Sequence, residues 1–256
     1  MSSRGATVIQ TNDGDNPIAV RFSDVTKTYR LYKNDRVRLL SAIWPKTKYE
    51  KVHANSGLSF TINRGESVAF LGSNGAGKST ALKITTGVTY PTSGTVEVNG
   101  RISALLDLSA GFDPQLTGRE NLMLRGLLWG LNTQEIIDLL PEITDFANIG
   151  QYIDQPMRTY SSGMRARLGF AFASALRPEI LILDEVLAVG DRRFSEKSLA
   201  RMKEIIEGDN VTLLFVTHSM HAAEQFCKRA IVIDHGKLLF DGPIAEGIEF
   251  YTNSTN

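Results

Sequence analysis

The sequence predicts an α/β fold in which a sheet of buried strands is interrupted by a helical insert. Short, mainly apolar runs at 67–71, 180–183 and 211–216 are typical of strands that are covered on both faces. Between the first two of these runs, from Thr117 to Leu176, apolar residues recur at helical spacing and β-branched runs are few. The 256 residues suffice for one large domain or two small lobes, and 42% hydrophobic with 22% charged residues is ordinary for a globular protein.

The first part of the chain is expected to be a leader followed by strands. Residues 1–16 are small and polar and predict a disordered leader, so the folded domain is expected over residues 17–256. A strand is expected at Ile18–Phe22, and an Asn-Gly pair at 99–100 predicts a tight turn. The next expected strands are Leu58–Ile62 and Ser67–Leu71, joined by a turn at 63–66, and a hairpin of Thr95–Val98 with Arg101–Leu106.

The helical insert is expected over about residues 107–177. Residues 132–135, Asn-Thr-Gln-Glu, are a plausible helix start, and apolar residues follow them at helical spacing. After the insert the sheet pattern returns, and two final strands are expected at Ile231–Ile233 and Lys237–Phe240.

Residues 72–79 carry the strongest functional signal, with the sequence Gly-Ser-Asn-Gly-Ala-Gly-Lys-Ser between an expected strand and an expected helix. The glycines let backbone N–H groups point at a phosphate chain, and the helix presents its positive end to the anion. Lys78 supplies charge for the terminal phosphates, and the Ser79 hydroxyl can hold a magnesium ion. This order predicts a site for ATP or GTP. The expected nucleotide-binding residues are Gly72, Ser73, Asn74, Gly75, Ala76, Gly77, Lys78, Ser79 and Thr80.

Polar residues at the ends of two later strands predict the rest of a phosphate-cleaving site. Asp184 closes the buried run at 180–183, where its carboxylate can reach magnesium together with Ser79. Glu185 follows and can polarise a water for attack on the γ-phosphate, and His218 can hydrogen-bond that phosphate. The structural alternatives are an acidic pair that caps a helix and a histidine at a strand end.

Residues 160–164, Tyr-Ser-Ser-Gly-Met, lie between the phosphate loop and the acidic pair. Ser161 and Ser162 are good helix N-cap residues, and Gly163 permits close backbone approach to an anion. In this position the segment resembles the signature motif of ATP-binding cassette (ABC) ATPases, usually Leu-Ser-Gly-Gly-Gln. The resemblance implies a P-loop NTPase fold with an α-helical and an antiparallel β subdomain, and it implies ATP with Mg²⁺ as cofactors. It also implies a two-chain site, in which Ser161, Ser162 and Gly163 of one copy close on the γ-phosphate held by the other.

Other positions match the family or depart from it. Tyr29 resembles the aromatic residue that stacks on adenine, although a half-buried tyrosine at a strand end is the alternative. Residues 188–191, Ala-Val-Gly-Asp, resemble the loop that signals across the dimer. The family's glutamine before the helical insert is missing: Leu108 stands at its place, beside Asp107.

The segments at 116–121, 159–171 and 188–191 resemble those of cassette subunits that export teichoic acids and capsular or O-antigen polysaccharides. This implies a homodimer working with two copies of a separate permease on a lipid-linked polysaccharide, at the cytoplasmic face of the bacterial cell membrane. The coupling surface for the permease is expected over about residues 105–130, with Phe112, Leu116, Leu122 and Trp129 as candidates. Packing in the core is the alternative for at least half of these four. The alternatives are another kind of ABC transporter and an ABC ATPase without a transport role.

A basic insertion at residues 33–51 contains six lysines and arginines against two acidic residues. Leu40, Ile43 and Trp44 follow helical spacing before Pro45. The insertion is expected either to meet the membrane interface and the lipid-linked pyrophosphate, or to be a solvated loop whose Trp44 packs on the sheet.

Bulk properties exclude several classes of protein. The formal net charge is zero, which gives no sign of a nucleic-acid surface. The one cysteine, Cys227, rules out an internal disulfide and is expected to be buried near a helix end. No apolar run is long enough to span a bilayer, and no signal peptide is evident.

Overall fold

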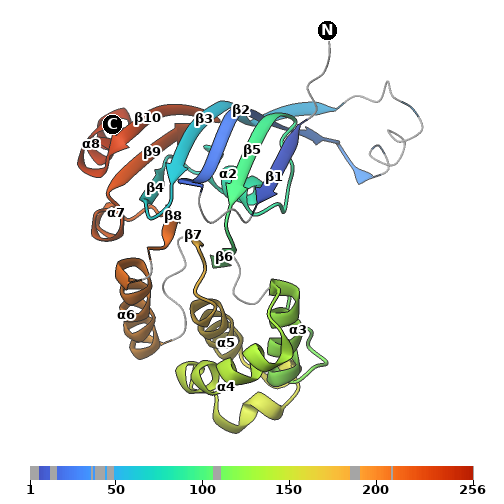
Figure 1. The fold of residues 1–256 in the computed structure, drawn as a ribbon. Coiled ribbons are helices and arrows are strands. Elements are labelled where there is room, and N and C mark those ends of the chain that lie inside the picture. Colours follow the sequence, from blue (N-terminus) through green and yellow to red (C-terminus); the bar gives the residue numbers. More distant parts are fainter. Residues whose placement is uncertain are drawn as a thin grey trace. The chain divides into compact units, whose positions relative to one another are not determined.

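The computed structural model describes residues 6–11, 16–35, 37, 44, 49–105, 111–184, 191–208 and 210–255. The chain divides into two compact units, one formed by residues 1–100 with 214–256 and the other by residues 101–213. Figure 1 labels the elements of both.

A four-stranded sheet in the first unit has the order β1-β5-β2-β3. β2 pairs antiparallel with both β3 and β5, and β1 pairs parallel with β5. The rings of Phe22 and Phe60, which are register partners, stack in the core with centroids 4.5 Å apart. The bounds are β1 Thr7–Thr11, β2 Ile18–Leu31, β3 Glu50–Asn63 and β5 Ser93–Asn99.

The prediction of a disordered leader is wrong for Thr7–Thr11, because these residues form the edge strand β1. The Thr11 hydroxyl donates a hydrogen bond to the side-chain oxygen of the buried Asn99. The Nδ2 of the same Asn99 side chain donates to the carbonyl of Ile18 at 2.8 Å. Most of β1 is exposed, so backbone pairing and this polar link hold it in place rather than apolar burial. The composition of residues 1–16 could not reveal this pairing with a distant strand.

The other strands of the first unit carry the phosphate loop. β4 (Ser67–Leu71) lies between β9 (Arg229–Asp234), to which it is parallel, and β8 (Thr212–Val216). β10 (Lys237–Pro243) pairs antiparallel with β9. The helices are α2 (Lys78–Thr85), α7 (Met220–Phe226) and α8 (Ile244–Thr255).

Two side chains show how this part is held together. The Arg229 guanidinium binds both carboxylate oxygens of Asp241, at 2.7 and 2.8 Å, and Glu66 at 2.7 Å, and the bond to Asp241 raises the pKa of Arg229. Cys227 is the C-cap of α7, and its burial raises the pKa of the thiol to about 12. The expected buried cysteine near a helix end is confirmed.

The second unit contains two parallel strands and a helical region. β6 (Ile102–Leu105) pairs with β7 (Ile180–Asp184). Both α3 and α4 begin with capping boxes, Thr117 with Glu120 and Asn132 with Glu135, so the helix start expected at 132–135 is confirmed. The helical segments are α3 Gly118–Trp129, α4 Thr133–Ala147, η1 Gly150–Asp154, η2 Met157–Thr159, α5 Ser162–Ala175 and α6 Arg192–Gly208.

The predicted hairpin around Asn99 and Gly100 is wrong. β5 pairs with β1 and β2, whereas β6 pairs parallel with β7. Gly100 has a φ of 130°, so it turns the chain as expected, but the strand after it finds its partner far along the sequence. An Asn-Gly pair specifies a turn and leaves the choice of strand partner to tertiary packing.

Among the residues that the structure describes, no helix is both long and apolar enough to cross a bilayer.

Candidate nucleotide-binding site

The glycine-rich segment forms a loop from the end of β4 to the start of α2, as predicted. Gly72, Gly75 and Gly77 have φ values of 149°, 81° and 107°. Residues with a side chain rarely adopt such backbone conformations. A Cβ at Gly72 would collide with the carbonyl oxygen of Ile233, and one at Gly77 with that of Ala54. At both positions glycine is required by conformation and by space.

The Lys78 ammonium lies within the loop that precedes it. Its Nζ donates to the carbonyl oxygens of Gly72 at 2.7 Å and Ser73 at 2.9 Å, and the side chain is buried. Both acceptors are neutral, so phosphate oxygens would be stronger partners for this cation. The lysine is therefore held where the loop can present it to an anion.

The first turn of α2 follows directly. Gly77 is its N-cap, and no side chain of the described residues caps this helix. The first N–H groups of a helix have no partner within it, and here they belong to residues from Lys78 onward. A loop of glycines that leads into an uncapped helix start is an anion-binding arrangement.

Asn55 is a member of this site that the sequence did not reveal. Its side chain is fully buried, its Nδ2 donates to the carbonyl of Gly77 at 3.1 Å, and its Oδ1 has no hydrogen-bond partner among the described residues. If side chains alternated regularly along β3, Asn55 would lie on the opposite face of the strand from the buried Leu58. The pairing of β2 with β3 is irregular on both sides of the Lys27–Asn55 pair, so the regular alternation does not hold there. In the sequence, the only sign that Asn55 belongs to the site was a single amide side chain within a strand.

The turn between β9 and β10 closes the loop from another direction. The Gly236 N–H donates to the carbonyl of Ala76 at 2.9 Å, and the Gly236 carbonyl accepts from the Ser56 N–H at 2.8 Å. The Ser73 hydroxyl donates to Asp234 at 3.1 Å. The loop is thus fixed by β3 and by this turn before any ligand binds.

Tyr29 lies on β2 with part of its ring exposed. The Lys27 ammonium lies 5.0 Å from the ring centroid and donates to the carbonyl of Tyr90 at 2.7 Å. Stacking of Tyr29 on adenine stays a prediction.

His218 lies just beyond the end of β8, the strand next to β4, and is separated from its last residue by Thr217. It is exposed, and the Ser219 hydroxyl after it caps α7 by accepting the Ala222 N–H at 3.2 Å. The predicted position at a strand end is confirmed, and contact with the γ-phosphate stays a prediction.

In the second unit, Asp184 is the last residue of β7 and its side chain is half-buried, as expected for a carboxylate at a strand end. Glu185 lies outside the described residues, as do Asp107, Leu108 and residues 188–190. Asp191 is described, and its Oδ1 accepts the Phe194 N–H at 2.9 Å at the start of α6.

The signature segment begins α5 as predicted. Ser161 is the N-cap, and its Oγ accepts the Met164 N–H at 3.2 Å. Ser162 is the first helical residue, and both serines are exposed. A Cβ at Gly163 would meet only Ser161 Oγ, at 3.9 Å, so the space beside this glycine is open.

A family model for the ABC transporter matches residues 55–188, just over half of the chain. The chain belongs to the ABC transporter family. The O-antigen export system ATP-binding protein RfbB of Klebsiella pneumoniae is 43% identical over 91% of this ABC protein and 96% of its own length. The teichoic acids export ATP-binding protein TagH of Bacillus anthracis is 40% identical, over 91% of this chain and 42% of its own length. The solved structure of an ATP-binding subunit of an ABC transporter matches with a TM-score of 0.74 at 22% identity, covering 93% of this chain and 100% of that one.

The chain therefore has the fold of its family. Leu122, one of the residues predicted for the permease-facing surface of this ABC protein, does not lie on a surface. Leu122 is fully buried in the core of the helical region, and Phe112 and Trp129 pack against that core. The Trp129 ring is held further, because its Nε1 donates to the carbonyl of Ile102 at 3.2 Å. The exposed apolar side chains of α3 are Leu124, Leu127 and Leu128, at 42%, 51% and 80% exposure.

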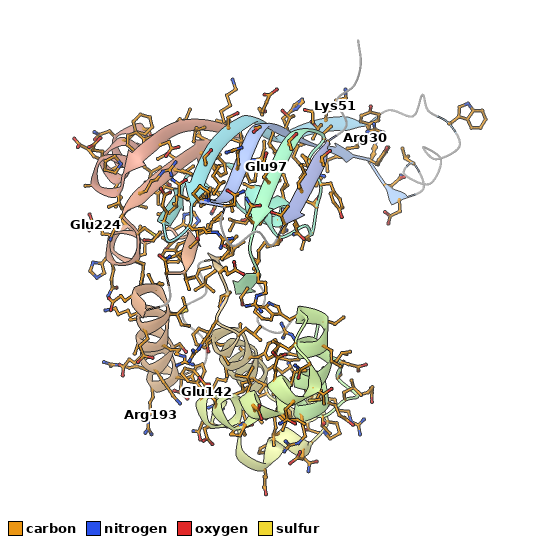
Figure 2. The ribbon with its side chains drawn as sticks, in the orientation of Figure 1. Arg30, Lys51, Glu97, Glu142, Arg193 and Glu224 are labelled. Carbon is orange, nitrogen blue, oxygen red and sulfur yellow. The ribbon has the colours of Figure 1, made fainter. Side chains whose placement is uncertain are left out.

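Little of the basic insertion in this ABC protein is described. Figure 2 labels Lys51, the last residue of the insertion, on β3 and its register partner Arg30 on β2. The Arg30 guanidinium lies 5.0 Å from the Tyr49 ring centroid. Trp44 is 67% exposed, so it is not buried on the sheet as one interpretation expected. The helix expected at 40–44 falls mostly outside the described residues.

The structure predicts that Asn55→Leu weakens nucleotide binding without a matching loss of stability. Leucine has a similar volume but cannot donate to the Gly77 carbonyl, so we expect the dissociation constant for ATP to rise about tenfold. The thermal midpoint should change little, because the unpaired Oδ1 is removed as well. Titration with a fluorescent ATP analogue and a melting curve give both numbers; wild-type affinity would reduce Asn55 to a space-filling residue.

Proposed function

We propose that this chain is the ATPase subunit of an ABC exporter, which hydrolyses ATP to drive a lipid-linked cell-surface polymer across the cytoplasmic membrane through a separate permease. The polymer class is teichoic acid or a capsular or O-antigen polysaccharide. One observation carries the proposal: relatives named for O-antigen and teichoic acid export match 91% of the chain at 40% identity or more. The preorganised phosphate loop supports the ATPase part.

The loop binds the triphosphate through its N–H groups and the first turn of α2, while Lys78 transfers its hydrogen bonds from loop carbonyls to the β- and γ-phosphates. Tyr29 stacks on the adenine. The exposed Ser79 hydroxyl and the half-buried Asp184 carboxylate are hard oxygen donors, which suit Mg²⁺. When bound, Mg²⁺ would neutralise charge on the phosphates.

Glu185 accepts a proton from the attacking water, and His218 donates a hydrogen bond to the γ-phosphate. The γ-phosphate is also bound by Ser161, Ser162 and Gly163 of a second copy. ATP thus joins two chains. When water attacks the γ-phosphorus, the bond to the β-phosphate oxygen breaks, and ADP and inorganic phosphate form, so no single molecule bridges the chains any longer. The change in dimer affinity is what the permease converts into alternating access.

The contact with the permease is proposed on the outer face of α3. Leu124, Leu127 and Leu128 are exposed within one helix, and exposed apolar side chains that cluster mark a protein-binding surface. Two chains would engage two permease copies in this way, which places the subunit at the cytoplasmic face of the membrane.

The catalytic assignment predicts that Glu185→Gln abolishes ATP turnover but keeps ATP binding and stabilises the dimer. Glutamine cannot take the proton, so we expect turnover to fall at least 100-fold. Phosphate release and light scattering with ATP measure the two effects. Glu249→Gln, a change at an exposed carboxylate on α8, is the control and should behave as wild type. Normal hydrolysis in Glu185→Gln would assign the base to another residue.

The proposed cargo predicts that cells depleted of this chain accumulate completed lipid-linked polymer in the cytoplasm. Expression of the wild-type chain in the depleted cells should restore surface polymer. Expression of the Lys78→Ala variant should not, because its phosphate loop has lost the cation. Fractionation and surface labelling of the polymer measure the result. Unchanged surface polymer after depletion would indicate another kind of ABC transporter.

The α3 assignment predicts that the double variant Leu127→Ser, Leu128→Ser loses most co-purification with the permease while ATP affinity stays within twofold. Ile137→Ser on α4 is the matched control, since that side chain is also exposed, at 45%, but lies on a different helix. Equal loss in both variants would argue for a general effect on the helical unit, and retention in both would place the permease contact elsewhere.

A further inference from the structure

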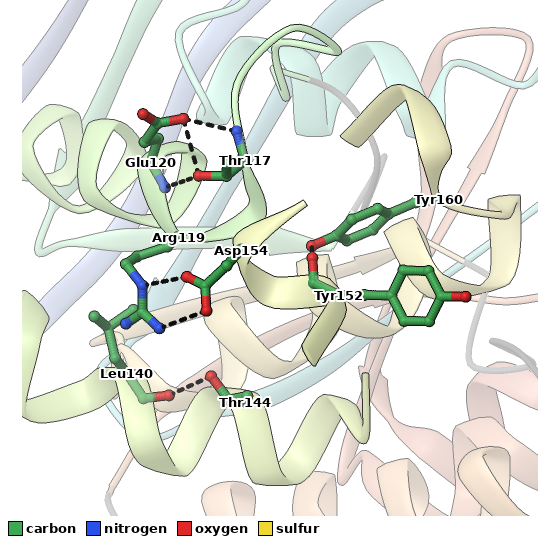
Figure 3. Close-up of polar contacts among 8 residues, drawn as sticks. All are labelled: Thr117, Arg119, Glu120, Leu140, Thr144, Tyr152, Asp154 and Tyr160. Atoms are coloured by element: carbon green, nitrogen blue, oxygen red, sulfur yellow. Dashed lines mark hydrogen bonds and ion pairs between the residues drawn. The ribbon is translucent and has the colours of Figure 1, made fainter. Parts of the chain in front are cut away.

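Tyr160, the residue directly before the signature serines, is buried although its hydroxyl is polar. The hydroxyl donates to the carbonyl of Tyr152, as Figure 3 shows. Burial raises the pKa of Tyr160 to about 12, so the phenol stays protonated and keeps donating at physiological pH. A buried tyrosine that satisfies its hydroxyl is held firmly, because breaking the bond leaves a buried polar group unpaired.

The same hydroxyl lies against the start of α3. The backbone of Gly118, the first residue of that helix, lies beside the Tyr160 phenol and lowers its pKa, against the larger effect of burial. A Cβ at Gly118 would collide with the Tyr160 hydroxyl and would lie 3.1 Å from the carbonyl oxygen of Ile153. Glycine at 118 and tyrosine at 160 therefore fit as a pair.

Further bonds join the segments before α3 and α5. The Met157 N–H donates to the Leu116 carbonyl at 2.9 Å. An isolated antiparallel β-bridge pairs Thr117 with Pro156. Arg119 binds Asp154 with two hydrogen bonds of 2.7 and 3.3 Å (Figure 3), and this partner lowers the pKa of the carboxyl. Tyr160 is the member of this set nearest the signature serines in sequence.

The backbone of Tyr160 is held as well as its side chain. Arg165, one turn into α5, donates from Nη1 to the Tyr160 carbonyl at 2.7 Å. The next residue, Ser161, is the N-cap of α5. A displacement of Tyr160 would therefore move the cap and the first helical N–H groups directly.

We propose that Tyr160 is a positioning residue: its hydroxyl, held by the Tyr152 carbonyl and the start of α3, sets where Ser161, Ser162 and Gly163 meet the nucleotide of a second chain. This inference rests on the proposed two-chain ATPase. Its physical basis is that a displacement of about 1 Å in a group that binds the transition state can cost roughly 100-fold in rate.

The test is Tyr160→Phe in the full chain, which keeps the ring and removes only the hydroxyl. We expect kcat for ATP hydrolysis to fall about tenfold, while ATP affinity stays within twofold, because the phosphate loop belongs to the other unit. Gly118→Ala should produce the same pattern by pushing on the phenol from α3. Wild-type kcat in Tyr160→Phe, or a parallel loss of ATP affinity and thermal midpoint, would overturn the proposal.

The matched control is Tyr152→Phe, which removes the exposed hydroxyl of Tyr152 and leaves its carbonyl acceptor in place. It should hydrolyse ATP at the wild-type rate, and a tenfold loss there would count against a specific role for the Tyr160 bond.

A double-mutant cycle with Ser161→Ala separates positioning from general destabilisation. If Tyr160 acts through Ser161, Tyr160→Phe should cost clearly less kcat in the Ser161→Ala background than in the wild type. Full additivity would overturn the proposal. Failure of the proposed function itself looks different: the wild-type chain would then show no ATP-dependent dimer and no turnover from which a loss could be measured.

Discussion

The close approach of two backbone carbonyls to the phosphate loop is the constraint on which the candidate site depends. The carbonyls of Ile233 and Ala54 occupy the space where side chains at residues 72 and 77 would lie. The loop can pass between β9 and β3 only with glycine at those positions, where its backbone takes positive φ angles of the kind found in anion-binding loops. The Asn55 amide and the turn at Gly236 then hold the loop in this shape, so the cost of ordering it falls on folding and not on binding ATP.

The two helix starts in the candidate site differ in a way that fits different roles. α2 has no side-chain cap among the described residues, so no side chain in this part of the molecule competes with a nucleotide for the helix start. α5 is capped by Ser161, whose hydroxyl is engaged with the Met164 N–H. A capped helix start is stable without ligand. That suits the role proposed for this surface, which is to meet the nucleotide held by a second copy of the chain.

The departures from the family pattern gather around the helical unit. Tyr160 stands where the family usually has leucine, and the structure links that tyrosine to α3, the helix with the exposed leucines. A mechanical connection between a permease-facing helix and the signature serines would need such a contact.

The sequence by itself determined the phosphate loop, the strand-end Asp184, a helix that begins at Ser161 or Ser162, and the helical character of the insert. Each of these depends on local chemistry: glycines, a buried run that ends in a carboxylate, a serine before a helix, and apolar spacing. Tertiary structure alone decided the partner of β6, the place of Thr7–Thr11 as an edge strand, the burial of Asn55 and Tyr160, and the burial of Leu122 rather than Leu127 or Leu128. These depend on which segments meet across long stretches of chain. Local propensity carries no information about such encounters, because the same residue is stable in either environment until its neighbours are known.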